Sequence, residues 1–254
     1  MKKEDYENWV NKAYQFIVEI HPQVCQREKV NVGSTQYIPT IDGDVEFVFL
    51  GHDAHEGRGE GGLLDITNAK ERFYKGNGNP RQWRLDKRWK IWNNIETAFK
   101  RIGFNEITDN GYISEEILEK TIVTNALLFN YSGKAKELNA TLGSCIVNQC
   151  MELAGELIFD VIKPKMVICL SCPLVFEPLI KNYCKNNNVV LHEYEIIHLE
   201  GTRKKVLRCV CNDVLVLGIP HTSYSVPDSV AAFVREAYLG KDISYKMMNR
   251  VSVK

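Results

Sequence analysis

The chain has 254 residues and a mass of 29.1 kDa, and its 32 basic residues balance its 32 acidic residues. This length suits one large domain or two small ones, and 44% hydrophobic with 25% charged residues is ordinary for a globular protein. The composition therefore excludes a coiled coil, a collagen or a disordered chain as the main architecture. Zero net charge excludes a protein that is basic over its whole surface.

Neither a membrane segment nor an export signal is visible. No run approaches the roughly 20 apolar residues that span a bilayer, and the charged start at residues 1–7 has no apolar stretch behind it. We therefore expect a cytoplasmic protein with no membrane partner. The eight cysteines fit this expectation as reduced, buried thiols, because several lie inside apolar runs. Two weaker alternatives are redox chemistry at Cys169 and Cys172 and a zinc site that these two share with Cys209 and Cys211.

The apolar pattern predicts helices and buried strands in alternation. Apolar residues spaced three and four apart predict helices, and short apolar runs that end at glycine or polar turns predict strands. Glycine is too frequent in residues 51–62 for a regular element. The predicted elements are, in chain order, a helix over 1–20 that ends before Pro22, a strand over 44–50, a helix over 85–102 with Trp89 and Trp92 on its apolar stripe, a strand over 121–128, a helix over 144–162, a strand over 165–171, a short helix over 173–185, a hairpin of 189–197 and 204–211, a strand over 213–217 and a helix over 228–239.

Apolar strands that alternate with amphipathic helices predict a parallel sheet that is covered on both faces. We therefore expect an α/β fold, a three-layer α/β/α sandwich with a central, mostly parallel four-stranded sheet and an extra hairpin near residues 189–211. The whole chain, residues 1–254, is predicted to form a single domain, with residues 1–43 as an N-terminal helical extension.

Polar motifs stand at or near the carboxyl end of each of the four predicted single strands. In parallel sheets, ligands bind at the carboxyl ends of the strands, so we expect the first, second and fourth motifs to meet in one pocket. An Asp orients or activates a water, and an Asn amide presents a donor beside an acceptor, which suits the edge of a pyrimidine. A His donates a hydrogen bond to charge that builds on a leaving group. The four motifs are Gly51-His52-Asp53-Ala54-His55, Asn125, Ser171-Cys172-Pro173 and His221-Thr222-Ser223.

In their order and spacing, these motifs resemble the uracil-DNA glycosylase superfamily. In that family a first strand ends in a Gly-x-Asp-Pro or Gly-x-x-Pro-Gly loop, a second strand ends in an Asn that reads the base, and a late strand leads into His-Pro-Ser. Residues Val48–Asp53, Ile122–Asn125 and Val216–Ser223 are similar to these motifs in turn, and residues 163–168 are similar to the family's third strand. The resemblance covers roughly residues 44–240.

The resemblance implies a protein that binds single- or double-stranded DNA, flips a nucleotide into the pocket and hydrolyses its N-glycosidic bond, as enzymes of DNA repair do. It implies that Asn125 hydrogen-bonds the base edge, together with a base-binding loop at Gly51 and His52. It also implies that His221 stabilises the anionic leaving base and that Asp53 positions water. Some members of the superfamily carry an iron-sulfur cluster on cysteines near the N-terminus and after the Asn-bearing strand. Here Cys25 stands alone and Phe129 stands four residues after Asn125, so we expect neither a metal nor a cofactor.

The chain also departs from the family pattern. Ala54 and Thr222 stand where many members have proline, and Asp65 stands where the family has the aromatic residue that stacks on the base. Phe73 or Tyr74 is the candidate substitute for that aromatic residue. Two other functions therefore stay open, namely a catalytically degenerate module that binds nucleic acid or a nucleobase, and a metal-dependent hydrolase that uses the His52–Glu56 loop.

Residues 68–93 predict a surface for nucleic acid. Eight basic residues stand there against two acidic ones, interleaved with five aromatic residues around a glycine-rich centre. Basic side chains neutralise phosphates, and exposed aromatic rings stack on unpaired bases. The alternative is that the aromatic residues are core and the charges form a solvated helix face. We expect contacts with nucleic acid from Arg81, Arg84, Ser223 and Tyr224.

Overall fold

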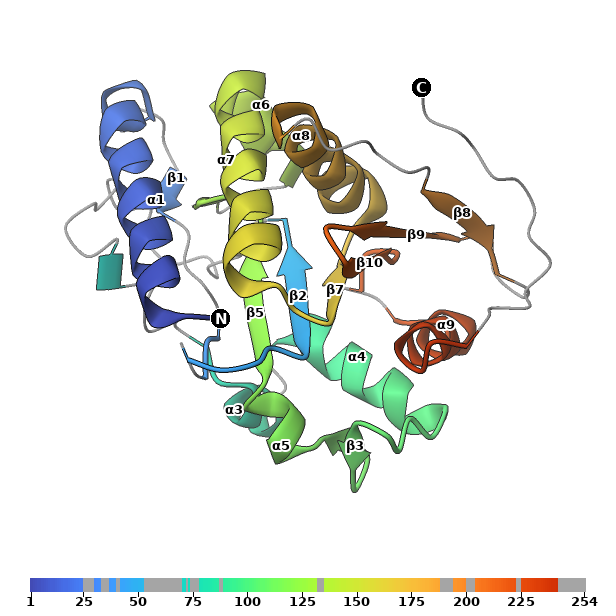
Figure 1. Cartoon of the computed structure of the whole chain (residues 1–254). Coiled ribbons are helices and arrows are strands. Elements are labelled where there is room, and N and C mark those ends of the chain that lie inside the picture. The colour runs from blue at the N-terminus through green and yellow to red at the C-terminus, as the bar shows by residue number, and fades with distance from the viewer. Residues whose placement is uncertain are drawn as a thin grey trace.

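The computed structural model describes residues 1–24, 30–32, 37–39, 42–52, 70–71, 73, 78–86, 89–131, 135–187, 194–199, 204–222 and 225–241 (Figure 1). Their centre is a six-stranded sheet in the order β5-β2-β7-β10-β9-β8. Its strands are β2 (Phe47–Gly51), β5 (Thr121–Asn125), β7 (Met166–Cys169), β8 (Glu195–His198), β9 (Lys205–Cys211) and β10 (Val214–Gly218).

The four strands β5, β2, β7 and β10 are parallel neighbours. They are the four single strands that the apolar runs predict, and the prediction of a parallel arrangement for them is confirmed. Residues in the middle of β2 are buried on both of its faces. This explains why these strands read as continuous apolar runs rather than as alternating ones.

The predicted hairpin forms, but it is not an addition beside the sheet. β8 and β9 pair antiparallel, and β9 also pairs antiparallel with β10, so the sheet has six strands rather than four. The chain reverses between β9 and β10 at Asn212 and Asp213, whose φ angles are 52° and 63°. Two positive φ values in a two-residue loop are typical of a tight turn that matches the twist of the paired strands. This turn makes β9 the immediate neighbour of β10.

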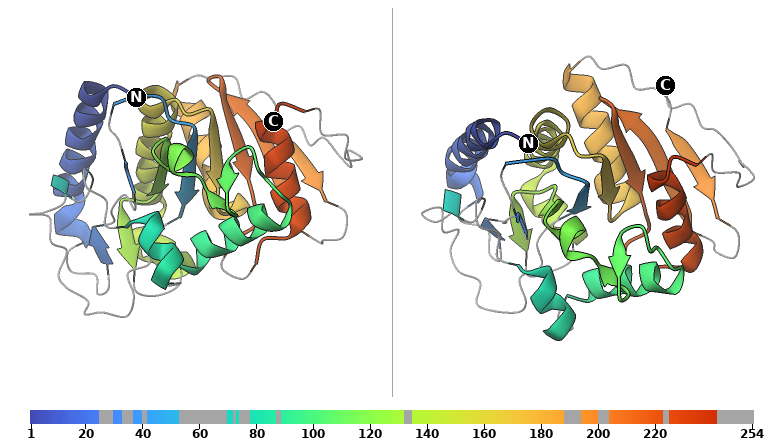
Figure 2. Two further views of the ribbon diagram at one scale, coloured as in Figure 1. Left: turned by 90° about the horizontal axis from the view of Figure 1, so that it is seen from below. Right: turned by 60° about the horizontal axis from the view of Figure 1, so that its bottom comes forward.

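Helices cover both faces of the sheet (Figure 2). One hydrophobic cluster joins Val48 and Leu50 of β2 to α1, α7 and α8, and a second cluster joins Phe47 and Phe49 of the same strand to α4 and α9. The alternation of side chains along β2 therefore divides the core in two. The helices are α1 (Lys3–Val24), α3 (Pro80–Asp86), α4 (Lys90–Arg101), α5 (Glu115–Leu118), α6 (Ala135–Leu142), α7 (Ser144–Glu156) with its continuation η1 (Leu157–Ile162), η2 (Cys172–Phe176) with its continuation α8 (Glu177–Asn187), and α9 (Asp228–Tyr238).

The N-terminal helix α1 packs on the core. Tyr6, Trp9 and Ile17 are fully or almost fully buried, and Trp9 Nε1 donates a hydrogen bond to the carbonyl of Leu153 in α7 at 2.9 Å. The helix includes Pro22 in its last turn instead of ending before it. The segment read as an N-terminal extension thus contributes to the first hydrophobic cluster.

The single helix predicted over residues 85–102 is wrong. The structure has two helices there, α3 and α4, and Trp89 between them has a non-helical backbone with φ −95° and ψ 81°. Leu85, at the start of the predicted helix, is 77% exposed. Trp89 lies between the two helices, is half-buried and packs at the edge of the second hydrophobic cluster.

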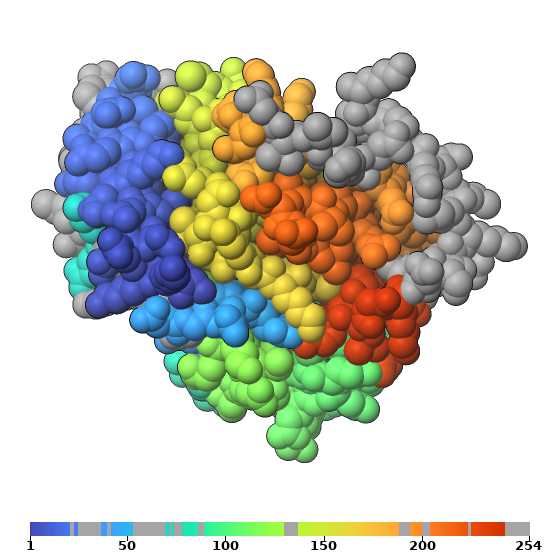
Figure 3. Space-filling view, viewed as in Figure 1, coloured from blue at the N-terminus to red at the C-terminus, as the bar shows by residue number. Residues whose placement is uncertain are grey.

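Two small sheets and the packing of α9 complete the fold. β1 (Val30–Val32) pairs with β6 (Phe129–Tyr131), and β3 (Thr108–Asp109) pairs with β4 (Tyr112–Ile113). In Figure 3, α9 (red) lies against the green part of the chain that contains α4. Within the part of the chain that the structure describes, no helix combines the length and apolar character needed to cross a membrane.

Candidate functional site

The register of the parallel strands brings the predicted motifs to one edge of the sheet. Gly51 at the end of β2 is the partner of Asn125 at the end of β5. Gly218 at the end of β10 is the partner of Cys169 at the end of β7, whose carbonyl accepts a hydrogen bond from Ile219 N at 3.0 Å. Because all four strands end at this edge, the loops that follow them lie next to each other.

A cavity of about 60 Å³ lies at these strand ends. One water needs roughly 10–15 Å³ of such space, so the cavity has room for more than a single water. We call it the strand-end pocket. Its lining combines apolar and aromatic side chains with a few polar groups, namely Gly51, His52, Trp89, Ile91, Val123, Thr124, Asn125, Leu170, Leu174 and His221. Four of the residues that the sequence predicts for the site, Gly51, His52, Asn125 and His221, therefore meet here.

Backbone hydrogen bonds hold the strand end that carries Asn125. Ala126 N donates to the carbonyl of Gly51 and Leu127 N donates to the carbonyl of His52, both at 2.9 Å, and these bonds join the end of β5 to the end of β2. A Cβ atom at Gly51 would overlap Asn125 Oδ1, so the absence of a side chain there leaves the amide its place. Glycine is required at this position by close approach rather than by its backbone angles.

Asn125 Nδ2 is buried and donates no hydrogen bond to any of the described residues. A buried polar group without a partner costs roughly 1–3 kcal/mol, and such groups in native proteins are rare enough to indicate a function. Asn125 lines the strand-end pocket together with two imidazoles. A ligand that enters this pocket is therefore a candidate acceptor for the unpartnered N–H.

The two histidines border the pocket at different depths. His52 is buried and follows Gly51 directly, whereas His221 is exposed. The loop of His221 is tied to α4, because Asn94 Nδ2 donates to the carbonyl of Thr222 at 2.7 Å. Thr222 itself is 1% exposed, and its hydroxyl oxygen has no hydrogen-bond partner among the described residues.

Trp89 is the site residue that the sequence reading missed. It was assigned to the core because residues 89 and 92 share a helical stripe, but it lies in the break between α3 and α4 and lines the pocket. Its ring packs on Trp83, with the centroids 4.1 Å apart, and Trp83 in turn packs edge-on against Trp92 at 5.7 Å. The sequence gives no clear signal for the break, since residues 81–102 contain neither glycine nor proline.

Phe73, the predicted base-stacking residue, is placed elsewhere. It is 1% exposed and packs edge-on against Trp9 at 6.0 Å between ring centroids. Its carbonyl accepts a hydrogen bond from the hydroxyl of Tyr6 at 2.6 Å. The aromatic face of α1 thus holds Phe73 in the core, and among the described residues Trp89 lines the strand-end pocket. Tyr74, the other predicted stacking residue, lies outside the described residues.

The arginines predicted to contact nucleic acid are engaged in ion pairs. Arg81 Nε and Nη2 bind Glu115 and Glu119 of α5, each at 2.7 Å, and these bonds raise the pKa of Arg81. Arg84 binds Glu96 of α4 through Nε and Nη2 at 2.9 and 2.7 Å. Both guanidinium groups therefore link helices. The other predicted residues, Asp53, Ser223 and Tyr224, lie outside the described residues.

The Arg84–Glu96 pair is largely buried, with side chains 14% and 3% exposed. Glu96 also accepts a hydrogen bond from Ile113 N at 3.1 Å, and Arg84 Nη2 donates to the carbonyl of Ile113 at 2.6 Å. Burial raises the pKa of Glu96, while the Arg84 guanidinium opposes that rise. The pair connects α3, α4 and β4.

The cysteines that the structure describes are free thiols, and six of the seven are buried. Burial raises the pKa of Cys172 to about 12 and also raises the pKa of Cys169. Because the reactive form of a thiol is the thiolate, these raised pKa values disfavour redox chemistry at the two cysteines. The described residues include no group of three or more His, Cys, Asp or Glu side chains placed to hold a metal ion. That finding disfavours a zinc site at Cys169, Cys172, Cys209 and Cys211. Residues 53–56 of the His52–Glu56 loop lie outside the described part.

No family model and no curated protein matches this chain.

Proposed function

We propose that this protein is a uracil-DNA glycosylase-like enzyme that releases a base from DNA by hydrolysis of its N-glycosidic bond. The observation that carries the proposal is the buried, unpartnered amide N–H of Asn125 in a pocket shared with His52, His221 and Trp89. A ligand with an acceptor beside a donor satisfies an Asn amide at both atoms. The edge of uracil has this pattern.

Each pocket residue has a part in the proposed reaction. Trp89 stacks on the flipped base, and Asn125 holds its edge. When the glycosidic bond breaks, the electron pair stays on the base, and His221 donates a hydrogen bond to that negative charge. Asp53 follows His52 directly in the chain, and we assign it the role of positioning the attacking water.

The free thiols of the described cysteines support a reducing compartment such as the cytoplasm.

The test is base release from oligonucleotides that contain one uracil, both single- and double-stranded. We expect release by the wild-type protein and a rate about 100-fold lower for His221→Ala, because removing one donor to a developing charge costs roughly 10²–10³ in rate. The product is measured by alkaline cleavage of the abasic strand. Release that persists with a chelator fits this mechanism and removes the metal-dependent alternative. Strand binding without any release assigns the pocket to recognition alone and overturns the enzymatic proposal.

A second variant tests the geometry of the pocket. Gly51→Ala introduces a methyl group where Asn125 Oδ1 lies, so the amide must rotate away from its position. We expect uracil release to fall at least tenfold, since misplacement of a positioning group by about 1 Å costs on the order of 10²-fold. Circular dichroism and thermal unfolding serve as the control for the fold. Wild-type activity in a folded Gly51→Ala protein would show that the amide does not read the base.

A further inference from the structure

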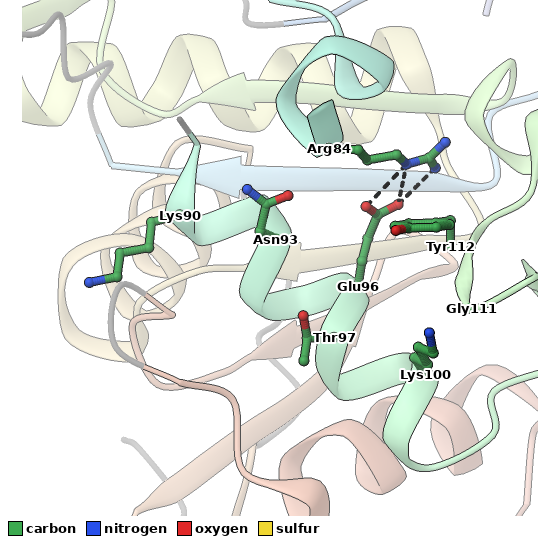
Figure 4. A pocket seen from close by; sticks show the side chains of 8 residues that line it. All are labelled: Arg84, Lys90, Asn93, Glu96, Thr97, Lys100, Gly111 and Tyr112. Atoms are coloured by element: carbon green, nitrogen blue, oxygen red, sulfur yellow. Dashed lines mark hydrogen bonds and ion pairs between the residues drawn. The ribbon is translucent and has the colours of Figure 1, made fainter. Parts of the chain in front are cut away.

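A second and larger hollow lies on the outer side of α4. Its volume is about 410 Å³, and its walls come from α3, α4 and the turn before β4 (Figure 4). We call it the α4 hollow. The residues that matter to its chemistry are Arg84, Lys90, Asn93, Thr97, Lys100 and Tyr112.

The net charge of the α4 hollow comes from two lysines. Arg84 is neutralised by Glu96, which also lines the hollow. Lys90 and Lys100 are exposed, and no carboxylate of the described residues forms an ion pair with either. Figure 4 shows them at opposite ends of the same helix face. The hollow therefore presents positive charge at two separate points.

The polar residues of α4 form a continuous stripe between these points. Positions 90, 93, 97 and 100 are spaced by three, four and three residues, which places them on one side of the helix. At a rise of about 1.5 Å per residue the stripe is about 15 Å long. Thr97 and Asn93 add a hydroxyl and an amide oxygen between the two lysines.

Tyr112 forms an aromatic wall of the same hollow. Its ring is 48% exposed, and the guanidinium of Arg84 lies 5.1 Å from the ring centroid. A tyrosine held in this way by a cation keeps one orientation at the surface. Exposed aromatic rings beside lysines are the combination by which proteins bind unpaired bases and their phosphates.

The α4 hollow and the strand-end pocket are connected by neighbouring residues of the chain. Trp89 lines the pocket, Lys90 lines the hollow, and the two residues are consecutive. We infer that the α4 hollow binds the single-stranded nucleic acid that flanks the base held in the pocket, with phosphates at Lys90 and Lys100 and a base stacked on Tyr112. The path of the strand rests on the proposed function. It also replaces Arg81 and Arg84 with the two lysines as the phosphate contacts.

The test is the affinity for a labelled single-stranded oligothymidine without uracil, measured by fluorescence anisotropy at salt concentrations from about 50 to about 200 mM. The variant is Lys90→Gln with Lys100→Gln. Two lost phosphate contacts lower the slope of log affinity against log salt by about 1.4, and we expect affinity at the lowest salt to fall roughly tenfold. The matched control, Lys181→Gln with Lys185→Gln on the exposed side of α8, should bind as the wild type does.

Stacking is tested separately from charge. Tyr112→Ala should weaken strand binding several-fold without a change in the salt slope, and Tyr112→Phe should restore it. An unchanged slope in the double lysine variant overturns the inference, as does a wild-type protein that does not bind the strand. The inference would also be overturned if inorganic pyrophosphate displaced the strand and bound the protein as tightly as the strand does, because the hollow would then be a site for small anions.

Failure of the two proposals can be told apart. If the lysine variants lose strand affinity but the wild type releases no base, the α4 hollow stands and the enzymatic proposal falls. If uracil is released and the lysine variants bind like the wild type, the pocket stands and the hollow falls.

Discussion

Asn125→Asp is expected to lower the rate of uracil release about 1,000-fold, since the loss of one preorganised donor costs roughly 10²–10³. The carboxylate keeps the acceptor but replaces the Nδ2 donor by a second acceptor, which then faces the carbonyl oxygen of uracil. Cytosine carries an amino group at the corresponding position, so the variant should lose less of any activity it has on cytosine. The measurement is single-turnover release from strands with one uracil or one cytosine.

The matched control for this variant is Asn148→Asp on α7, an exposed side chain whose amide oxygen lies 3.5 Å from Asn182 Nδ2. It makes the same chemical change outside the pocket and should leave release unchanged. Affinity of Asn125→Asp for the oligothymidine strand should also match the wild type. Equal uracil release by Asn125→Asp and the wild type contradicts the assignment of Asn125 to the base edge.

Arg84→Met is expected to lower the free energy of unfolding by about 3–5 kcal/mol at pH 7, because it leaves the carboxylate of Glu96 buried without its partner. Urea unfolding followed by circular dichroism measures the loss. The control is Arg81→Met in the same helix. Arg81 is 43% exposed, and exposed ion pairs contribute about 0–1 kcal/mol each.

The pH dependence of Arg84→Met identifies the cause of its instability. Burial already raises the pKa of Glu96, and the loss of Arg84 raises it further. The folded protein then binds a proton more tightly than the unfolded chain, so stability rises as the pH falls through the folded pKa. We expect the deficit against the wild type to shrink between pH 7 and pH 5. The double variant Arg84→Met with Glu96→Leu should recover most of the lost free energy of unfolding, because no buried carboxylate is then left without its partner. A deficit that is independent of pH and persists in the double variant contradicts the account.

The parallel strands were predictable because each is a short apolar run that ends at a glycine or a polar turn. This pattern is local, so it can be read without knowing which other elements pack against the strand. It also places Gly51, Asn125 and His221 at the same edge of the sheet, as the register of β2 with β5 and of β7 with β10 bears out. The prediction that these strand-end motifs meet thus followed from topology alone.

Other features depended on partners far away in the chain. The arginines of α3 look like free cations in the sequence, but the carboxylates that bind them lie between 12 and 38 residues further on. In the sequence, Phe73 looks available for stacking on a base. In the structure, Trp9 of α1, which lies 64 residues earlier in the chain, packs against it. Trp89 and Trp92 share one helical stripe in the sequence, and only the backbone at Trp89 separates the pocket residue from the core residue.

The sequence by itself determined the α/β class, the four parallel strands and the polar groups at their ends. Hydrophobic periodicity and turn residues are sufficient for these, because both are read from neighbours in the chain. The tertiary structure alone decided which aromatic ring of the described residues lines the pocket, that the Asn125 donor has no partner among those residues, and that Arg81 and Arg84 form ion pairs with described carboxylates whereas Lys90 and Lys100 do not. The physical reason is that burial and charge pairing depend on contacts between residues distant in the chain, which a sequence pattern does not contain.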